Sequence, residues 1–65
     1  MTKQNMRIIA HDLRKIQSSL KSIVQILEGD DETEEIAEEV EHAKRNIGHA
    51  AVALEQMLKL PGKTQ

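Results

Sequence analysis

The feature that most constrains the fold is an apolar repeat that runs without a break through the first half of the chain. Apolar residues recur between Met6 and Leu27 at alternating spacings of three and four residues. This spacing is the a/d pattern of a heptad repeat, and it predicts a helix with one side covered by other helices. With Met6 at position a, its members are Met6, Ile9, Leu13, Ile16, Leu20, Ile23 and Leu27.

A second repeat of the same kind occupies the other half of the chain, between Ile36 and Met57. Pro61 and Gly62 follow it, and neither continues a helix. We therefore predict one all-α domain that contains two helices. The predicted segments of residues 1–65 are a first helix over about 6–28, a turn over 29–31, a second helix over about 32–60 and a polar tail over 61–65.

The predicted turn contains residues that suit the ends of helices. Gly29 is expected to end the first helix in the left-handed conformation that glycine adopts without strain. Asp31 and Glu34 have the spacing of a capping box for the second helix, and Thr2 or Asn5 is expected to cap the first. Because the linker is short, the two helices are expected to form an antiparallel hairpin.

The apolar face of each helix is wider than one partner helix covers, because the e positions are also largely apolar, as at Ala10 and Val24. A face three-sevenths of the helix wide is typical of a helix inside a bundle. We therefore predict a homodimer in which two hairpins form a four-helix bundle. Its expected core consists of Leu13, Ile16, Leu20, Ile23, Leu27, Val40, Ile47 and Leu54.

The composition argues against several classes of function. The chain has no Cys, which excludes disulfides and thiolate zinc sites and fits a reducing compartment. It has no Phe, Tyr or Trp, so it offers no platform on which nucleic-acid bases stack. No apolar run approaches the ~18 residues of a membrane span, and the N-terminus lacks the apolar core of a signal peptide. We expect a cytoplasmic protein that binds neither nucleic acid nor a membrane.

Charge is unevenly distributed along the chain. Residues 28–41 contain nine acidic residues and no basic one. Residues 1–27 have a net charge of +4, and residues 42–65 have a net charge of +3. The hairpin is therefore expected to be acidic at its turn and mildly basic elsewhere, too weakly for a general DNA or membrane binder.

His11 lies at position f of the first helix, the position farthest from the a/d seam. A rigid helix is expected to hold its imidazole toward water. Arg7, Arg14 and Lys15 lie three or four residues away and share its face. A neutral imidazole has a free ring nitrogen that can attack phosphorus, and these cations would stabilise an attached phosphoryl group. Asp12 could orient the ring or accept its proton.

The segment His11-Asp12-Leu13-Arg14 resembles the H-[DE]-L-R core of the dimerisation and histidine-phosphotransfer domain of sensor histidine kinases. The resemblance covers residues 6–60. It implies a dimeric bundle whose His accepts phosphate from an ATP-bound catalytic domain and passes it to an aspartate on a response-regulator receiver domain. On this resemblance His11 is the phosphoacceptor, and Asp12 is the acid that helps to activate it. The implied partners are a receiver domain or a histidine kinase.

Two positions depart from the family's pattern. Ile16 stands where a Pro usually bends the helix, and Lys15 stands where Thr or Asn often positions water for phosphatase activity. No nucleotide-binding domain follows, so we expect no autonomous kinase activity and a phosphate donor on another protein. The segment Ala10–Arg14 is also similar to the A-H-x-L-K opening of monomeric histidine phosphotransfer domains. That second resemblance gives His11 the same chemistry but implies a different oligomeric state.

Each of these features also has a simpler interpretation. An exposed His on a polar helix face is ordinarily a solvated side chain. Ile8 and Val52 lie outside the apolar face, at one level if facing residue numbers sum to about 60. They form either a docking patch for a receiver domain or scattered surface apolar residues. The alternative function is a non-catalytic adaptor, chaperone or inhibitor that packs against partner helices.

The other histidines do not suggest a metal site. His42 and His49 are seven residues apart, roughly 10 Å along a helix, which is too far to share a metal ion. Glu39 and His42 have the Glu-x-x-His spacing of di-iron bundles but lie outside the apolar stripe. We expect neither a metal nor a cofactor.

Overall fold

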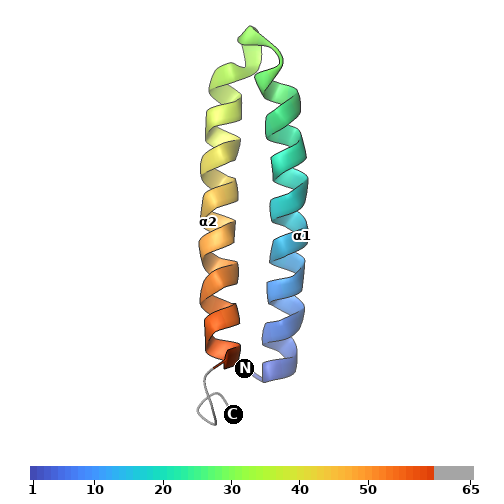
Figure 1. The fold of residues 1–65 in the computed structure, drawn as a ribbon, viewed down its shortest axis with the longest axis vertical. Coiled ribbons are helices and arrows are strands. Elements are labelled where there is room, and N and C mark those ends of the chain that lie inside the picture. Colours follow the sequence, from blue (N-terminus) through green and yellow to red (C-terminus); the bar gives the residue numbers. More distant parts are fainter. Residues whose placement is uncertain (60–65) are drawn as a thin grey trace.

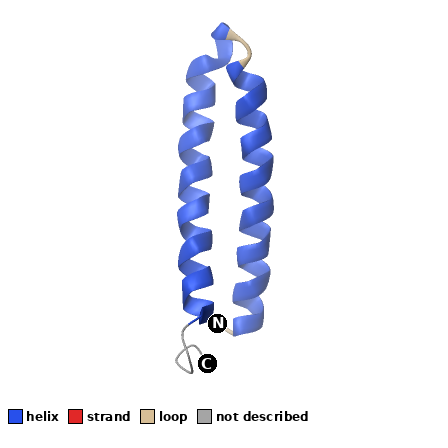
Figure 2. Ribbon diagram, viewed as in Figure 1, coloured by secondary structure: helices blue, strands red, loops and turns tan. Residues whose placement is uncertain are grey.

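The computed structural model describes residues 1–59 and is an antiparallel hairpin of two long helices (Figure 1). Helix α1 spans Lys3–Glu28 and helix α2 spans Glu34–Lys59, each with 26 residues. A short 3-10 helix, η1, spans Asp31–Thr33 between them. The described residues contain no strand (Figure 2), and the rod measures 50 × 14 × 14 Å. The predicted all-α hairpin is confirmed; the predicted end of α2 at residue 60 and the polar tail lie outside the described residues.

Helix α1 begins three residues earlier than predicted because Thr2 is the residue that caps it. The Thr2 hydroxyl oxygen accepts a hydrogen bond from the backbone N–H of Asn5 at 3.1 Å. Thr2 itself is extended, with φ −81° and ψ 159°, as expected of an N-cap residue. Asn5, the other candidate cap, therefore lies inside the first turn.

The turn does not use a left-handed glycine, so that prediction was wrong. Gly29 has φ −75° and ψ −2°, a right-handed conformation open to any residue. The chain reverses through η1 instead, and Asp30 rather than Asp31 caps it, accepting from the backbone N–H of Glu32 at 3.1 Å. The Thr33 hydroxyl donates to the backbone carbonyl of Leu27 at 2.7 Å and so satisfies a terminal carbonyl of α1.

The seam between the helices is formed by positions a and e of α1. Met6, Ala10 and Val24 are buried along it, with 2%, 5% and 5% of their surface exposed. The other buried residues are all alanine or glycine, and larger apolar residues of both helices pack beside them half-buried. The buried residues of α2 are Ala37, Gly48 and Ala51.

The register of the two helices is offset from the predicted one. A Cβ added to Gly48 would clash with the side-chain amide of Gln17, so these two residues face each other across the seam. Their numbers sum to 65 rather than 60. The offset arises because η1 lengthens the connection and moves the start of α2 to Glu34. The contact also explains the glycine in the middle of a helix, because it makes room for the Gln17 side chain.

Enlarging a seam alanine should destabilise the hairpin. Ala51 is fully buried, whereas Ala53 on the same helix is exposed. Ala51→Leu is expected to lower the free energy of unfolding by about 1–3 kcal/mol because the added atoms overpack the seam. The matched control Ala53→Leu is expected to change it by less than about 0.5 kcal/mol. Urea unfolding followed by circular dichroism measures both free energies. Equal stability of the two variants would contradict the burial of Ala51 between the helices.

Candidate functional site

His11 lies on the outer surface of α1, with 73% of its side chain exposed. This exposure agrees with the prediction that position f of the first helix faces water. The Nδ1 atom is 4.0 Å from Oδ1 of Asp12, which is longer than a hydrogen bond, and 64% of the Asp12 side chain is exposed. Within residues 1–59 the imidazole forms no hydrogen bond, and the carboxylate lies on the Nδ1 side of the ring.

Arg14, one of the three cations predicted to surround His11, is already engaged in a bidentate ion pair. Its Nε donates to Oε2 of Glu55 at 2.9 Å, and its Nη2 donates to Oε1 of Glu55 at 2.7 Å. Its Nη1 donates to Oε1 of Gln17 at 2.9 Å. Stabilising a phosphoryl group on His11 would require Arg14 to leave these partners.

Arg7 and Lys15 are the other two predicted cations. Both are exposed, and within residues 1–59 neither forms an ion pair. They lie one helical turn before and one turn after His11, on the same face. Of the three, these two are available to an anion bound at the imidazole.

The ion pair shifts the titration of both partners. The hydrogen bond from Arg14 is the main cause that lowers the pKa of Glu55; partial dehydration opposes it, and the attraction of the charge adds to it. The same hydrogen bond raises the pKa of Arg14 above its usual value. Sequence reasoning missed Glu55 because the predicted register placed Arg14 opposite Asn46, more than two turns from Glu55.

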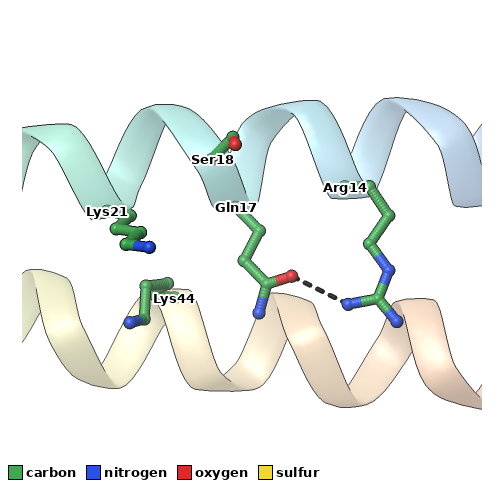
Figure 3. A pocket seen from close by; sticks show the side chains of 5 residues that line it. All are labelled: Arg14, Gln17, Ser18, Lys21 and Lys44. Atoms are coloured by element: carbon green, nitrogen blue, oxygen red, sulfur yellow. Dashed lines mark hydrogen bonds between the residues drawn. The ribbon is translucent and has the colours of Figure 1, made fainter.

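A shallow groove of about 350 Å³ lies beside this ion pair (Figure 3). Four of its residues come from α1 and one from α2. The Nζ atom of Lys44 lies 3.3 Å from Oε2 of Glu41, whereas Lys21 forms no ion pair in the described part of the chain. The residues that line the groove are Arg14, Gln17, Ser18, Lys21 and Lys44.

One flank of the hairpin is polar. Position b of α1 lies about 80° from the a/e seam and carries Arg7, Arg14 and Lys21. The ion pair between Arg14 and Glu55 places Glu55, and with it Glu41 two heptads earlier, on this side of α2. We call these five residues the polar flank.

The opposite flank is apolar and exposed. Position d of α1 lies about 80° from the seam on the side away from position b. Ile16 and Ile23 expose 45% and 43% of their surface there, and Ile36 and Met57 of α2 expose 53% and 43%. We call this surface the apolar flank. It consists of Ile9, Ile16, Ile23, Ile36, Ala43, Ala50 and Met57.

The residues predicted to form a dimer core divide between the apolar flank and the contact between the two helices. Ile16 and Ile23 are exposed on the apolar flank. The others already pack within the hairpin, where they are half-buried. They are Leu13, Leu20, Leu27, Val40, Ile47 and Leu54.

The predicted docking pair of Ile8 and Val52 is exposed, at 51% and 40%, but the structure does not bring the two residues together. With facing numbers summing to 65, Val52 lies level with Leu13 rather than with Ile8. The two side chains are therefore separated by roughly 7 Å along the rod as well as by their positions around it.

No metal-binding cluster of three or more His, Cys, Asp or Glu residues is present among residues 1–59. Neither α1 nor α2, over the residues described, is apolar enough along its length to cross a membrane. No protein-family model, curated protein or solved structure matches this chain.

The ion pair predicts a pH-dependent contribution to stability. The pKa of Glu55 is lower in the folded chain than in the unfolded chain. Its contribution is therefore present at neutral pH and is lost as the pH falls below the usual carboxyl value of 4.5 through the lowered value. Glu55→Gln should melt at a lower temperature than the parent at neutral pH, and the difference should disappear in acid.

Glu39→Gln is the matched control, because Glu39 is exposed and forms no ion pair with any described residue. Thermal melts followed by circular dichroism at a series of pH values compare the three chains. A gap between the parent and Glu55→Gln that stays constant from neutral pH into acid would contradict the role of the ion pair.

Proposed function

We propose that the hairpin is a histidine phosphocarrier, a phosphotransfer module of the two-component signalling type that carries phosphate on His11. The observation that supports this function best is the 73% exposed imidazole on an unbroken helix, with a carboxylate beside it. A carrier must reach both a donor and an acceptor, and a side chain on the outer surface of a rod is open to both. A cytoplasmic location and a receiver-domain partner belong to this proposal.

The chemistry uses the two ring nitrogens differently. Nδ1, nearest to Asp12, carries the proton, and the lone pair of Nε2 attacks the phosphorus of an aspartyl phosphate on the partner. The phosphorus–oxygen bond to the partner breaks, and the electron pair leaves with the aspartate carboxylate. The Nδ1 proton then passes to Asp12 or to water, which leaves a neutral phosphorylated ring.

The surroundings of His11 suit the phosphorylated state. Arg7 and Lys15 have no ion pair within the described residues, and each lies four residues from His11 on the same face of the helix. Charge-assisted hydrogen bonds from these cations would stabilise the phosphoryl oxygens. Lys21, in the groove beside the ion pair, adds positive charge that attracts an acidic partner surface.

Substitution of His11 tests the carrier. The chain is incubated with a panel of radiolabelled phosphorylated receiver domains, and with phosphoramidate as a direct donor to histidine. The parent is expected to gain phosphate that is labile in acid and stable in base. His11→Gln should lose that phosphate while circular dichroism shows an intact helix, and His49→Gln, on the exposed face of α2, should retain it. Label that persists in His11→Gln, or a parent that stays unlabelled with every donor, would contradict the proposed phosphocarrier function.

The second candidate is a non-catalytic helical-hairpin adaptor, and the apolar flank is the observation that favours it. Exposed apolar residues lie along both helices on the side away from the ion pair. They extend from the turn to near the opposite end of the hairpin, where α1 begins and α2 ends, which we call the open end. Packed against the helices of a partner, this flank would give binding without any chemistry at His11.

Two substitutions separate the adaptor from the carrier. Ile16 is exposed, so Ile16→Asp should leave the hairpin folded and abolish binding to a partner, measured by calorimetry. In the adaptor, His11→Gln leaves the affinity unchanged; a large loss of affinity in His11→Gln would instead favour the carrier. Leu13→Asp is a poor test of either, because Leu13 packs within the hairpin and its loss would unfold the chain.

A further inference from the structure

The apolar flank is an exposed surface that the described part of the hairpin leaves without a partner. Only five apolar residues of the described chain are buried, and three of these are alanines. A chain of this size buries a small core, and self-association is a common way to enlarge it. An apolar stripe beside the seam on both helices is the geometry of half a four-helix bundle.

Charge along the rod favours a second copy as the occupant. The half of the rod next to the turn, residues 17–48, carries nine acidic and three basic residues. The open-ended half, residues 1–16 and 49–59, carries two acidic and five basic residues. Each rod is therefore negative at one end and positive at the other, and a reversed copy presents the complementary charge along the same length.

We propose that two copies pack through their apolar flanks with the rods antiparallel, so that the acidic turn of one lies beside the basic open end of the other. In a parallel pair the two acidic halves would lie side by side and repel each other. In the antiparallel pair each acidic half faces a basic half. The charges thus decide the orientation, and the apolar flank supplies the contact.

The sizes of the side chains on the apolar flank favour the same orientation. In the observed register Ile9 lies nearly level with Met57, Ile16 with Ala50, and Ile23 with Ala43. A parallel pair would place two bulky Ile–Met pairs in one layer at the open end. An antiparallel pair centred on Ile16 places each Ile–Met pair against an Ile–Ala pair of the other copy, so that the layers fill more evenly. Layers of similar volume let the two rods pack without voids while their separation stays constant along the length.

The antiparallel pair leaves the other surfaces of the hairpin free. His11 lies roughly 160° around α1 from position d, so both imidazoles stay on the outside of the assembly. The polar flank and its groove face away from the contact. This assembly does not depend on phosphate transfer, and its failure would leave the proposal for His11 untouched.

Distances between spin labels at the turn measure the orientation. The chain has no native cysteine, so Glu32→Cys in η1 carries a single label in each copy. In the antiparallel pair the two labels should be roughly 40 Å apart, from 1.5 Å per helical residue. In a parallel pair they should be within roughly 20 Å. Ser19→Cys, near the middle of the rod, is the control, because its labels are close in either orientation.

Sedimentation tests the contact and its charge dependence. A dimer is expected at micromolar concentration, and its association constant should fall with added salt because the attraction is screened. Ile16→Asp should give a folded monomer. Val52 is an apolar residue on the far side of α2 and is exposed to a similar extent as Ile16. Val52→Asp should therefore leave the dimer intact.

Three results would overturn this assembly. Turn labels within roughly 20 Å would make the pair parallel. A dimer that Val52→Asp removes and Ile16→Asp leaves intact would place the contact on another face. A parent chain that stays monomeric at micromolar concentration would exclude a second copy as the occupant of the apolar flank and would favour a partner of a different sequence.

Discussion

The packing of small residues along the a/e seam is the constraint on which the other features of the hairpin depend. Small residues are buried along it on both helices: Ala10 on α1, and Ala37, Gly48 and Ala51 on α2. Small side chains let the two backbones approach closely, and close packing of the helices sets how each is rotated about its axis. That rotation decides which positions face solvent, and on which side.

The rotation sorts the charged and apolar residues onto different flanks. Position b of α1 turns toward Glu55, so Arg14 forms a bidentate pair with a carboxylate from the other helix. Position d turns the opposite way and exposes Ile16 and Ile23. His11 lies outside both flanks. A phosphoryl group there would therefore meet solvent and the side chains of Arg7 and Lys15, which form no ion pair within residues 1–59, while Arg14 stays paired with Glu55.

Local hydrogen bonds at the turn set the register of the two helices. The carboxylate of Asp30 caps η1, and the hydroxyl of Thr33 closes the end of α1. These contacts lengthen the connection beyond the tight glycine turn expected from the sequence. The resulting offset brings Gln17 opposite Gly48, where a larger residue would clash, and Arg14 within reach of Glu55.

The sequence by itself determined the two helices, the hairpin and the exposure of His11, because periodicity and helix geometry are local properties. Only the tertiary structure decided that position e, rather than the more apolar position d, packs beside position a. Both stripes border position a on α1, and the choice between them depends on the shape of α2 far along the chain. The same holds for the partner of Arg14, which lies 41 residues away and is reached only once the register of the packed helices is set.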